Sequence, residues 1–506
     1  MNWRPRPFSI WRMAWPLSGA IALWSARAKA TDYDITSDSA AQFYDVRSPT
    51  GEVTVSRQRF VTTLGLSAEN LTHAAGYDPI APFVSIRARI RYDSDFGLNG
   101  ATFDPSQTDA FVPGGAANSV DVMFAYLEGR RLLRGILGFR LGRQYVTDVL
   151  GWWSFDGAEI DAVTPLFLRT QVYGGLEQRG GLALSSSRFE SDGVWRGSRD
   201  GFAASLAPSF QSASAAPAIG FAIETVGIRW IHGRLTARQV YNTGTSNVAG
   251  FDPSWAAPRT IDGWRTSTER IGGSIDATWT HVGAAQGGCV YDAYRAAVTH
   301  LYGSIDAHVH PRLSLGAEYD YYVPSFDADS VWNFFAAEPR NDVALRADAT
   351  PADHVAIAAS AKLRVLAVPV LPTDVGTAYD RAGIAPNNGH AFNEGFTGSL
   401  RWHSGTTNAG LRAAGDFGEE GDRVGADVHA ERMLEARYIL RTRVGLWHWD
   451  DRLRPDRSAA SLGCVAGLGY RFSPRAQAMV EWEQDMNRLV EQRFRLMFSL
   501  TLASSP

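Results

Sequence analysis

The sequence is poor in several features that define other classes of protein. Beyond residue 30 it contains no run of about 18 uncharged apolar residues, so no later segment is expected to cross a bilayer as a helix. Its two cysteines, Cys289 and Cys464, allow at most one disulfide among 506 residues. They could pair in an oxidising compartment, but we expect two isolated thiols, because Cys464 falls on an alternating apolar face. No metal-binding spacing surrounds either cysteine.

Catalytic and nucleic-acid-binding motifs are also missing. The sequence has no nucleophile elbow, no zinc-protease motif and no phosphate-binding glycine loop. We therefore expect no enzyme activity, no catalytic residue, no cofactor, no metal site and no nucleic-acid partner. The formal net charge of −4 is small for 506 residues and indicates no particular partner.

Lysine is nearly absent. Of 49 basic residues only Lys29 and Lys362 are lysines, and the other 47 are arginines. A compositional bias toward arginine and alanine is one explanation. The other is functional, because the rigid guanidinium fork suits contact with anions better than a flexible ammonium group does.

What the sequence does contain is unbroken alternation of apolar and polar residues. In the segment VSIRARIRY at 84–92, the apolar residues share one face of a strand, and Arg87, Arg89 and Arg91 share the other. A soluble core could not bury three unpaired arginines, whereas a water-filled lumen accepts them. The segment is therefore typical of a transmembrane β-barrel strand, with one face in hydrocarbon and the other in water.

Similar alternation recurs along the chain. It predicts further strands at 120–126, 137–144, 271–281, 297–309, 313–321, 436–446, 462–472 and 476–482. Very short turns at 310–312 and 473–475 join two pairs of these strands, as expected on the tight side of a barrel. Longer stretches rich in Gly, Pro and Asp predict loops at 93–119, 145–158, 243–268, 322–341 and 370–395.

The first 30 residues read as a secretory signal peptide. Arg4, Arg6 and Arg12 form its charged part, an apolar run follows at 13–24, and Ala28-Lys29-Ala30 is the cleavage site. We therefore expect three parts: a signal peptide at 1–30, an N-terminal segment at 31–50 and an outer-membrane β-barrel at 51–506. The predicted location is the outer membrane of a bacterial cell.

The end of the chain supports a barrel. In the segment 493–502 the apolar residues Phe494, Leu496, Phe498, Leu500 and Leu502 share one face. This resembles the closing strand of bacterial outer-membrane barrels, although the chain continues to Pro506. The 476 residues after the signal, at roughly 25 residues per strand with its connection, predict about 18 strands, within 16 to 20. A secreted soluble β protein is the alternative, and the arginine-lined face argues against it.

One short region resembles known families. The segments GFRLGRQ at 138–144 and WWSFDGA at 152–158 look like the Gly-Arg-Gln strand and following loop of porin-like barrels of the alginate-export and phosphate-selective porin type. The resemblance implies a monomeric or trimeric diffusion or export channel with Arg143 or Gln144 near its outer mouth. The scarcity of lysine means that a phosphate-binding ladder is not carried over. A second stretch, at 319–335, resembles uncharacterised outer-membrane barrels.

The faces opposite the apolar ones give the candidate pore-lining residues. If the apolar faces contact lipid, the lumen is lined by Arg87, Arg89, Arg91, Arg140, Arg441, Arg443, Glu318, Asp320, Glu481 and Glu483. Acidic and basic walls that face one another would create a transverse field that orients dipolar solutes. The alternative is that these charges only pair with one another and solvate a polar lumen.

The loop after residue 321 concentrates aromatic side chains. Its candidates for a constriction are Tyr322, Phe326, Trp332, Phe334 and Phe335. Folded inward, the loop would narrow the pore; folded outward, it would cap the barrel or meet a partner; it could also pack on itself. Two further clusters are more ordinary: His308 with His310 could chelate a metal, and Glu481 with Glu483 could serve acid–base chemistry, but we expect both to be plain polar groups.

These patterns favour a passive channel for small polar, or anionic, solutes. The alternative is a closed barrel with a structural or surface-interaction role, and a third reading is a barrel enzyme acting on lipids, for which no nucleophile is evident. The expected partners are outer-membrane lipid and small polar solutes, and a homo-oligomer is compatible with the resemblance.

Overall fold

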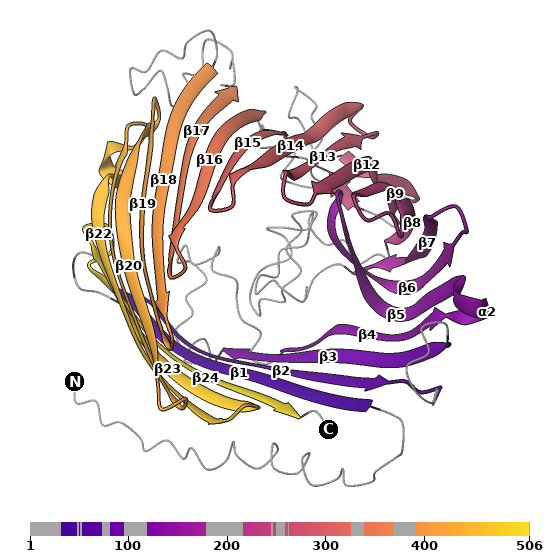
Figure 1. Cartoon of the computed structure of the whole chain (residues 1–506), viewed down its shortest axis with the longest axis horizontal. Helices are drawn as coiled ribbons and strands as arrows, with labels where there is room; N and C mark the ends of the chain where they lie inside the picture. The colour runs from indigo at the N-terminus through magenta and orange to yellow at the C-terminus, as the bar shows by residue number, and fades with distance from the viewer. Residues whose placement is uncertain are drawn as a thin grey trace.

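The computed structural model describes residues 32–47, 50, 53–72, 81–95, 119–178, 216–243, 246–248, 259–261, 263–324, 339–367 and 390–504. Within these residues, 22 strands form one antiparallel sheet that closes into a barrel (Figure 1). Each barrel strand pairs with its neighbours in chain order, and the first strand pairs with the last. The predicted signal peptide lies outside the described residues.

The strands of the barrel have the following bounds: β1 Asp32–Arg47, β2 Val53–Glu69, β3 Phe83–Asp95, β4 Ser119–Arg131, β5 Leu137–Asp148, β6 Gly151–Val163, β7 Leu168–Glu177, β8 Pro217–Thr225, β9 Ile231–Asn242, β12 Arg265–Trp279, β13 Gly283–Asp292, β14 Ala297–His310, β15 Leu313–Tyr322, β16 Arg340–Ala352, β17 Val355–Ala367, β18 His390–Ser404, β19 Thr407–Gly418, β20 Gly421–Leu434, β21 Tyr438–Asp451, β22 Ala459–Ser473, β23 Ala476–Asn487 and β24 Gln492–Ser504. A separate hairpin is formed by β10 (Ser246–Val248) and β11 (Arg259–Ile261).

Helical structure is confined to two short turns in the described parts of the chain. These are α2 (Leu132–Gly135), between β4 and β5, and the 3₁₀ turn η6 (Pro455–Arg457), between β21 and β22. No helix among the described residues is long and apolar enough to cross a membrane.

The prediction of an all-β, single antiparallel barrel is confirmed. The alternating segments predicted from the sequence lie within β3, β4, β5, β12, β14, β15, β21, β22, β23 and β24, with two exceptions. Residues 280–281 fall in the turn after β12, and residues 436–437 fall in the turn before β21. The two short turns are also where the sequence places them, between β14 and β15 and between β22 and β23.

The predicted strand number was wrong. The barrel has 22 strands, whereas the sequence predicted about 18, within 16 to 20. The assumed length per strand was too large, because many connections are two-residue turns. For example, β16 ends at Ala352 and β17 begins at Val355, and β18 ends at Ser404 and β19 begins at Thr407.

The predicted loop at 145–158 was also wrong. Residues up to Asp148 belong to β5, and residues from Gly151 belong to β6, with a tight turn between them. The sequence signal failed because Trp152, Trp153 and Phe155 place aromatic rings on both faces of β6, so apolar and polar residues do not alternate there. Other predicted loops are partly strand: β10 and β11 fall within 243–268, and β16 begins at Arg340.

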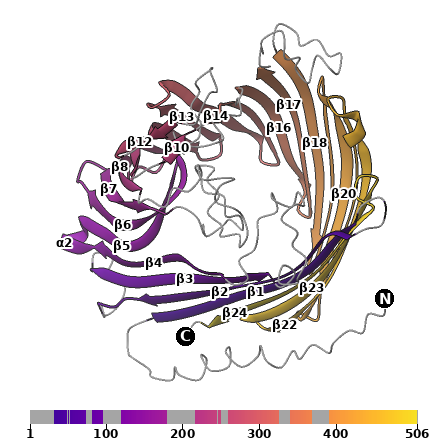
Figure 2. The same cartoon turned by 180° about the vertical axis from the view of Figure 1, so that it is seen from behind.

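The barrel begins earlier than the predicted boundary at residue 51. Strand β1 lies within the predicted N-terminal segment and pairs with both β2 and β24. Figure 1 shows the indigo β1 beside the yellow β24, and Figure 2 shows the same seam from behind. The sequence signal was weak because Ser37 and Ser39 stand at outer-face positions, opposite Leu502 and Leu500 of β24.

The two faces of the sheet differ in composition. Large apolar side chains are exposed along one face, as shown by Ile160, Leu345 and Val428, which are 56%, 62% and 55% exposed. Charged residues occupy the alternate positions. Because only an apolar surface is stable against hydrocarbon, the first face is the outer one. Cys289 and Cys464 are both free, as predicted.

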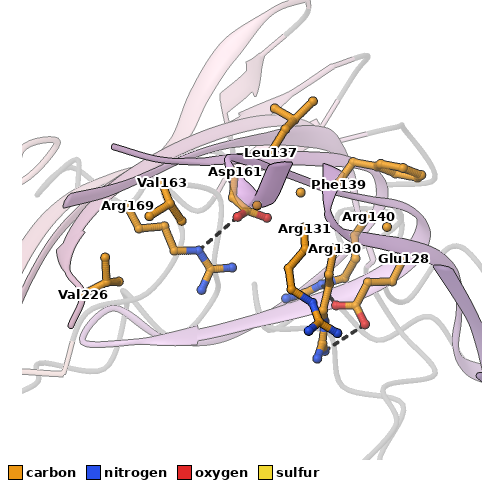
Figure 3. A pocket seen from close by; sticks show the side chains of 13 residues that line it. Glu128, Arg130, Arg131, Leu137, Phe139, Arg140, Asp161, Val163, Arg169 and Val226 are labelled. Carbon is orange, nitrogen blue, oxygen red and sulfur yellow. Dashed lines mark hydrogen bonds and ion pairs between the residues drawn. The ribbon is translucent and has the colours of Figure 1, made fainter. Parts of the chain in front are cut away.

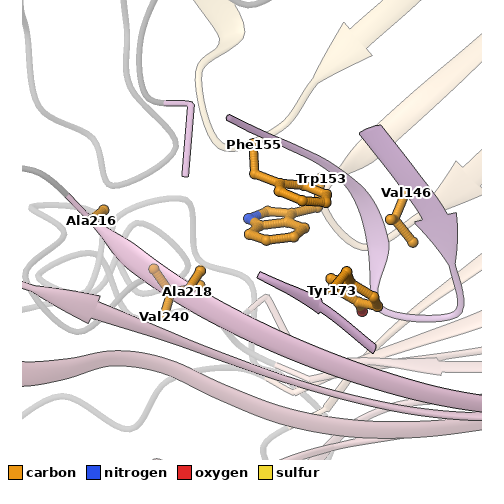
Figure 4. Packing of buried hydrophobic residues seen from close by; sticks show 7 residues of the cluster. All are labelled: Val146, Trp153, Phe155, Tyr173, Ala216, Ala218 and Val240. Atoms are coloured by element: carbon orange, nitrogen blue, oxygen red, sulfur yellow. The ribbon is translucent and has the colours of Figure 1, made fainter. Parts of the chain in front are cut away.

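The inner face of β5 to β9 forms a small core, which we call the packed corner. It contains Val146, Trp153, Phe155, Tyr173, Ala216, Ala218 and Val240, all nearly inaccessible to solvent (Figure 4). The rings of Trp153 and Phe155 stack with centroids 4.3 Å apart. Elsewhere the inner face of a barrel this wide has no opposite wall within reach, so a core here requires the sheet to curl.

Glycines permit that curl. Gly142, Gly157 and Gly175 stand side by side on neighbouring strands of the corner. A Cβ atom on Gly157 would lie 2.0 Å from the carbonyl oxygen of Gly174, so no larger residue fits. As a result the β5–β6 turn reaches over β7 and β8: Thr236 of β9 donates a hydrogen bond to Asp148 at 2.9 Å, and Val149 lies against Gly272 of β12.

Candidate functional site: the charged inner wall

The arginine column of β3 is paired with carboxylates of the two preceding strands. Arg87 contacts Glu69 of β2 at 2.6 Å. Arg89 contacts Asp38 of β1 at 3.0 Å and Thr63 of β2 at 3.1 Å. Arg91, the third member, is largely buried. The first two guanidinium groups are therefore neutralised locally, by residues that the antiparallel register places beside them.

Arg140, whose side chain is 25% exposed, lies between two buried carboxylates of the inner wall. Its guanidinium contacts Glu128 of β4 at 3.3 Å and Glu159 of β6 at 3.6 Å. Both carboxylates are buried, and Glu159 also accepts a hydrogen bond from Gln171 at 3.1 Å. Charges removed from water need close partners, and Arg140 and Gln171 supply these partners to the two carboxylates.

A cavity of about 440 Å³ adjoins this cluster at one end of β4, β5 and β6 (Figure 3). Figure 3 shows two ion pairs on its sides: Arg169 with Asp161 at 3.2 Å, and Arg130 with Glu128 at 2.8 Å. Its lining alternates charged and apolar side chains, which suits a hydrated recess better than a binding site for an apolar ligand.

Strands β14 to β17 carry an acidic part of the wall organised around single arginines. Arg346 of β16 contacts three carboxylates: Asp306 at 2.5 Å, Glu318 at 2.8 Å and Asp348 at 3.2 Å. On the next strand Arg364 holds Asp342 of β16 at 2.6 Å. Four carboxylates contact these two arginines, so this part of the wall has more acidic than basic side chains.

Asp320 belongs to a second group in the same region. Its carboxylate contacts His300 of β14 at 2.7 Å and Arg340 of β16 at 3.3 Å. Arg340 also lies over the ring of Tyr322, 5.2 Å from the ring centroid. Tyr322 is the one predicted constriction aromatic that falls among the described residues; Phe326, Trp332, Phe334 and Phe335 lie outside them.

The inner face of β18 to β24, which we call the open wall, holds the remaining predicted residues. Arg441 contacts Glu431 at 2.8 Å and Glu481 at 3.2 Å, and Arg443 contacts Asp427 at 3.2 Å. Glu483 pairs with Arg493 at 2.9 Å and with Arg495. A cavity of about 600 Å³ lies over these strands.

The ten predicted charged residues thus lie on the inner face, and the structure joins most of them to neighbouring strands. Within the predicted set, the ion pairs among described residues bring Arg441 and Glu481 together. Sequence reasoning missed their main partners: Glu69, Glu128, Glu159, Arg346 and Glu431. Alternation through Val343 and Leu345 could have identified Arg346 as an inner-face residue.

Other predicted residues have ordinary local contacts. The Nδ1 atom of His308 is 2.8 Å from the hydroxyl of Ser314, and Nδ1 of His310 accepts the backbone N–H of Arg312 at 3.2 Å. Gln144 is fully buried in the packed corner. Arg143 lies on the opposite, outer face, in a bidentate pair with Asp156. No group of three or more potential metal ligands occurs among the residues that the structure describes.

No protein-family model and no curated protein matches the chain. The solved structure of Pseudomonas aeruginosa OpdK with vanillate aligns over 94% of this chain and 99% of its own, with 10% identity and a TM-score of 0.41. Acinetobacter baumannii OccAB4 aligns over 95% and 99%, with 8% identity and a TM-score of 0.43. The translocation pore of the P pilus usher PapC aligns over 94% and 99%, with 9% identity and a TM-score of 0.42.

Scores this low define no family and no shared residues, so the assignment of the barrel rests on its own strands. Those strands satisfy every requirement of a membrane-spanning sheet: closure without a free edge, an apolar outer face and a charged inner face. The chain is an outer-membrane β-barrel.

Proposed function

We propose that this barrel is a passive channel for small polar solutes and that the ten predicted charged residues line its lumen. The observation that carries the proposal is the solvent exposure of inner-face charges. The side chains of Arg443, Arg493 and Asp348 are 56%, 51% and 48% exposed, although each belongs to an ion pair. Charges this accessible on the inner side of a closed sheet support a water-filled lumen.

The pairing of these charges bears on selectivity. A wall in which most arginines have a carboxylate within ion-pair distance presents little net potential, and solvent exposure weakens what remains. We therefore infer weak discrimination between cations and anions over most of the lumen. Strand β3, with its arginines, lies across the ring from the acidic β14 to β16 region (Figure 1), an arrangement that supports a modest transverse field acting on dipolar solutes.

The rival proposal is a closed barrel with a structural or surface-interaction role. The packed corner favours it, because aromatic side chains there fill part of the interior. An open lumen and a blocked lumen differ in one measurable property, the passage of ions.

The test is single-channel conductance of the refolded mature protein in a planar bilayer. We expect discrete current steps, with a reversal potential close to zero under a salt gradient. The folded state is judged by resistance to unfolding in mild detergent. If the folded protein gives no current steps, the result favours the closed barrel. A strongly cation- or anion-selective current would contradict the inference about paired charges.

A further inference from the structure

Arg401 and Arg412 differ from the arginines of the open wall that are held in ion pairs. Arg423, which also has no carboxylate within ion-pair distance among the described residues, lies instead over the ring of Trp447, 4.7 Å from its centroid. Arg401 of β18 and Arg412 of β19 each follow a residue of the outer face, Leu400 and Leu411, so both belong to the inner face. Both are exposed to the lumen. Among the described residues, no carboxylate lies within ion-pair distance of either guanidinium, whereas Lys362 nearby is paired with Asp416 at 3.3 Å.

The register places these two arginines next to each other. Arg412 stands opposite Ser399, and Arg401 stands opposite Gly410, two residues along the same face. Diagonal neighbours of this kind are about 7 to 8 Å apart in an antiparallel pair. The imidazole of His429 lies over Gly410, where a Cβ atom would be 2.4 Å from it, so His429 is a third polar group beside these two arginines.

The two guanidinium groups border space large enough for a solute. Both line the cavity of about 600 Å³ over the open wall, together with the hydroxyl groups of Ser399 and Thr442. Arg412 also lines an adjoining cavity of about 430 Å³, which contains Lys362. Arg412 therefore lies where the two spaces meet.

Each carboxylate that lines the larger cavity contacts another arginine, although Asp427 stands opposite Arg412 and its second oxygen, Oδ2, has no hydrogen-bond partner among the described residues. Asp427 holds Arg443, Glu431 and Glu481 hold Arg441, and Glu483 holds Arg493 and Arg495. Only Arg401 and Arg412 contribute charge to this cavity without an acidic partner among the described residues. A guanidinium presents its N–H groups in a planar fork that matches a carboxylate or a phosphate, and such charge-assisted hydrogen bonds are the strong ones.

We propose that Arg401 and Arg412 form an oxyanion-binding subsite on the lumen wall, which holds the carboxylate or phosphate group of a small solute during its passage. This inference rests on the proposed channel function and names its substrate class. The hydroxyl groups of Ser399 and Thr442 complete the polar lining, and the paired arginines around it keep other carboxylates of the wall from occupying the site.

The experiment measures block of chloride current through single channels by two probes, benzoate and inorganic phosphate. The variant Arg401→Gln/Arg412→Gln is compared with Arg340→Gln/Arg364→Gln, which removes the same charge from arginines that are already paired with Asp320 and Asp342. We expect the half-blocking concentration of at least one probe to rise about tenfold in the first variant and to stay within about twofold of the parent in the second.

Each outcome decides the proposal. Relief of block for benzoate alone identifies a carboxylate solute, and relief for phosphate alone identifies a phosphorylated one. A conducting channel that neither probe blocks, or an equal rise in the control variant, overturns the subsite while leaving the channel intact. A folded protein without conductance overturns the channel instead; calorimetry of both probes on the protein in detergent micelles then tests the subsite alone, and absence of binding rejects it.

Discussion

The packed corner and the open wall are built from the same antiparallel pairing, yet their inner faces have opposite properties. In the corner, Phe155 and Tyr173 are 0% and 1% exposed, whereas the side chains of Arg443 and Arg493 on the open wall are 56% and 51% exposed. The difference is curvature. Where Gly142, Gly157 and Gly175 let the sheet bend onto itself, inner side chains meet and exclude water; where the wall is broad, they face the lumen.

The largest effect on stability should come from removing a buried aromatic ring from the packed corner. Phe155→Ala removes a fully buried ring and should lower the free energy of unfolding by about 3 to 5 kcal/mol. Phe472→Ala, at an outer-face position that is 62% exposed, is the matched control and should cost much less. Denaturant unfolding of the refolded proteins in detergent measures both values, and similar losses for the two variants would mean that the corner is not a core.

Removing a buried carboxylate should give the second-largest loss in the free energy of unfolding. Glu128→Gln removes a buried carboxylate and leaves Arg140 with Glu159 as its remaining partner, and we expect a loss of about 3 kcal/mol. Glu318→Gln in the exposed acidic region leaves Arg346 with two other carboxylates, and we expect a change below about 1 kcal/mol. The same unfolding measurement applies, and equal losses would contradict the difference in solvent access.

The glycine row gives a smaller effect, of about 1 to 3 kcal/mol. Gly157→Ala places a methyl group against the backbone of Gly174, whereas Gly398→Ala on β18 meets nothing within 4 Å. We expect the first variant to refold with lower yield and lower stability and the second to match the parent. Normal behaviour of Gly157→Ala would show that the curl does not depend on close backbone approach.

The smallest effect should come from a single ion pair of the open wall. Glu431→Gln frees Arg441 from its main partner, which should shift the reversal potential slightly toward anions while changing stability by less than about 1 kcal/mol. The double variant Glu431→Gln/Arg441→Gln should return the reversal potential toward that of the parent. A shift toward cations would indicate that the wall potential is set elsewhere.

The sequence was most informative where each strand has one apolar and one polar face. Strands β3, β14, β15 and β22 follow that pattern and were predicted, as were the turns that join β14 to β15 and β22 to β23. It failed where the pattern is broken: at β6, which carries aromatic rings on both faces, and at β1, where serines stand on the outer face. The predicted number of strands was also wrong, because it was calculated from an average number of residues per strand and connection.

The candidate site was predictable only in part. Alternation places Arg87 or Arg441 on the inner face without a structure. Their partners could not be predicted, because an ion pair such as that of Arg441 with Glu481 joins residues 40 positions apart through a register that no local pattern specifies. Arg401 and Arg412 have no acidic partner among the described residues, and this too depends on the register of neighbouring strands, which no local pattern specifies.

The seam between β1 and β24 has a consequence for biogenesis. Their pairing runs from Ile35 opposite Ser504 to Arg47 opposite Gln492, so the first strand to be exported keeps one unsatisfied backbone edge until the last strand arrives. Such an edge is open to pairing with any other extended chain. The chain therefore needs protection in the periplasm for the whole of its secretion, and a copy shortened by its final strand would expose two such edges and be a substrate for proteolysis instead of insertion.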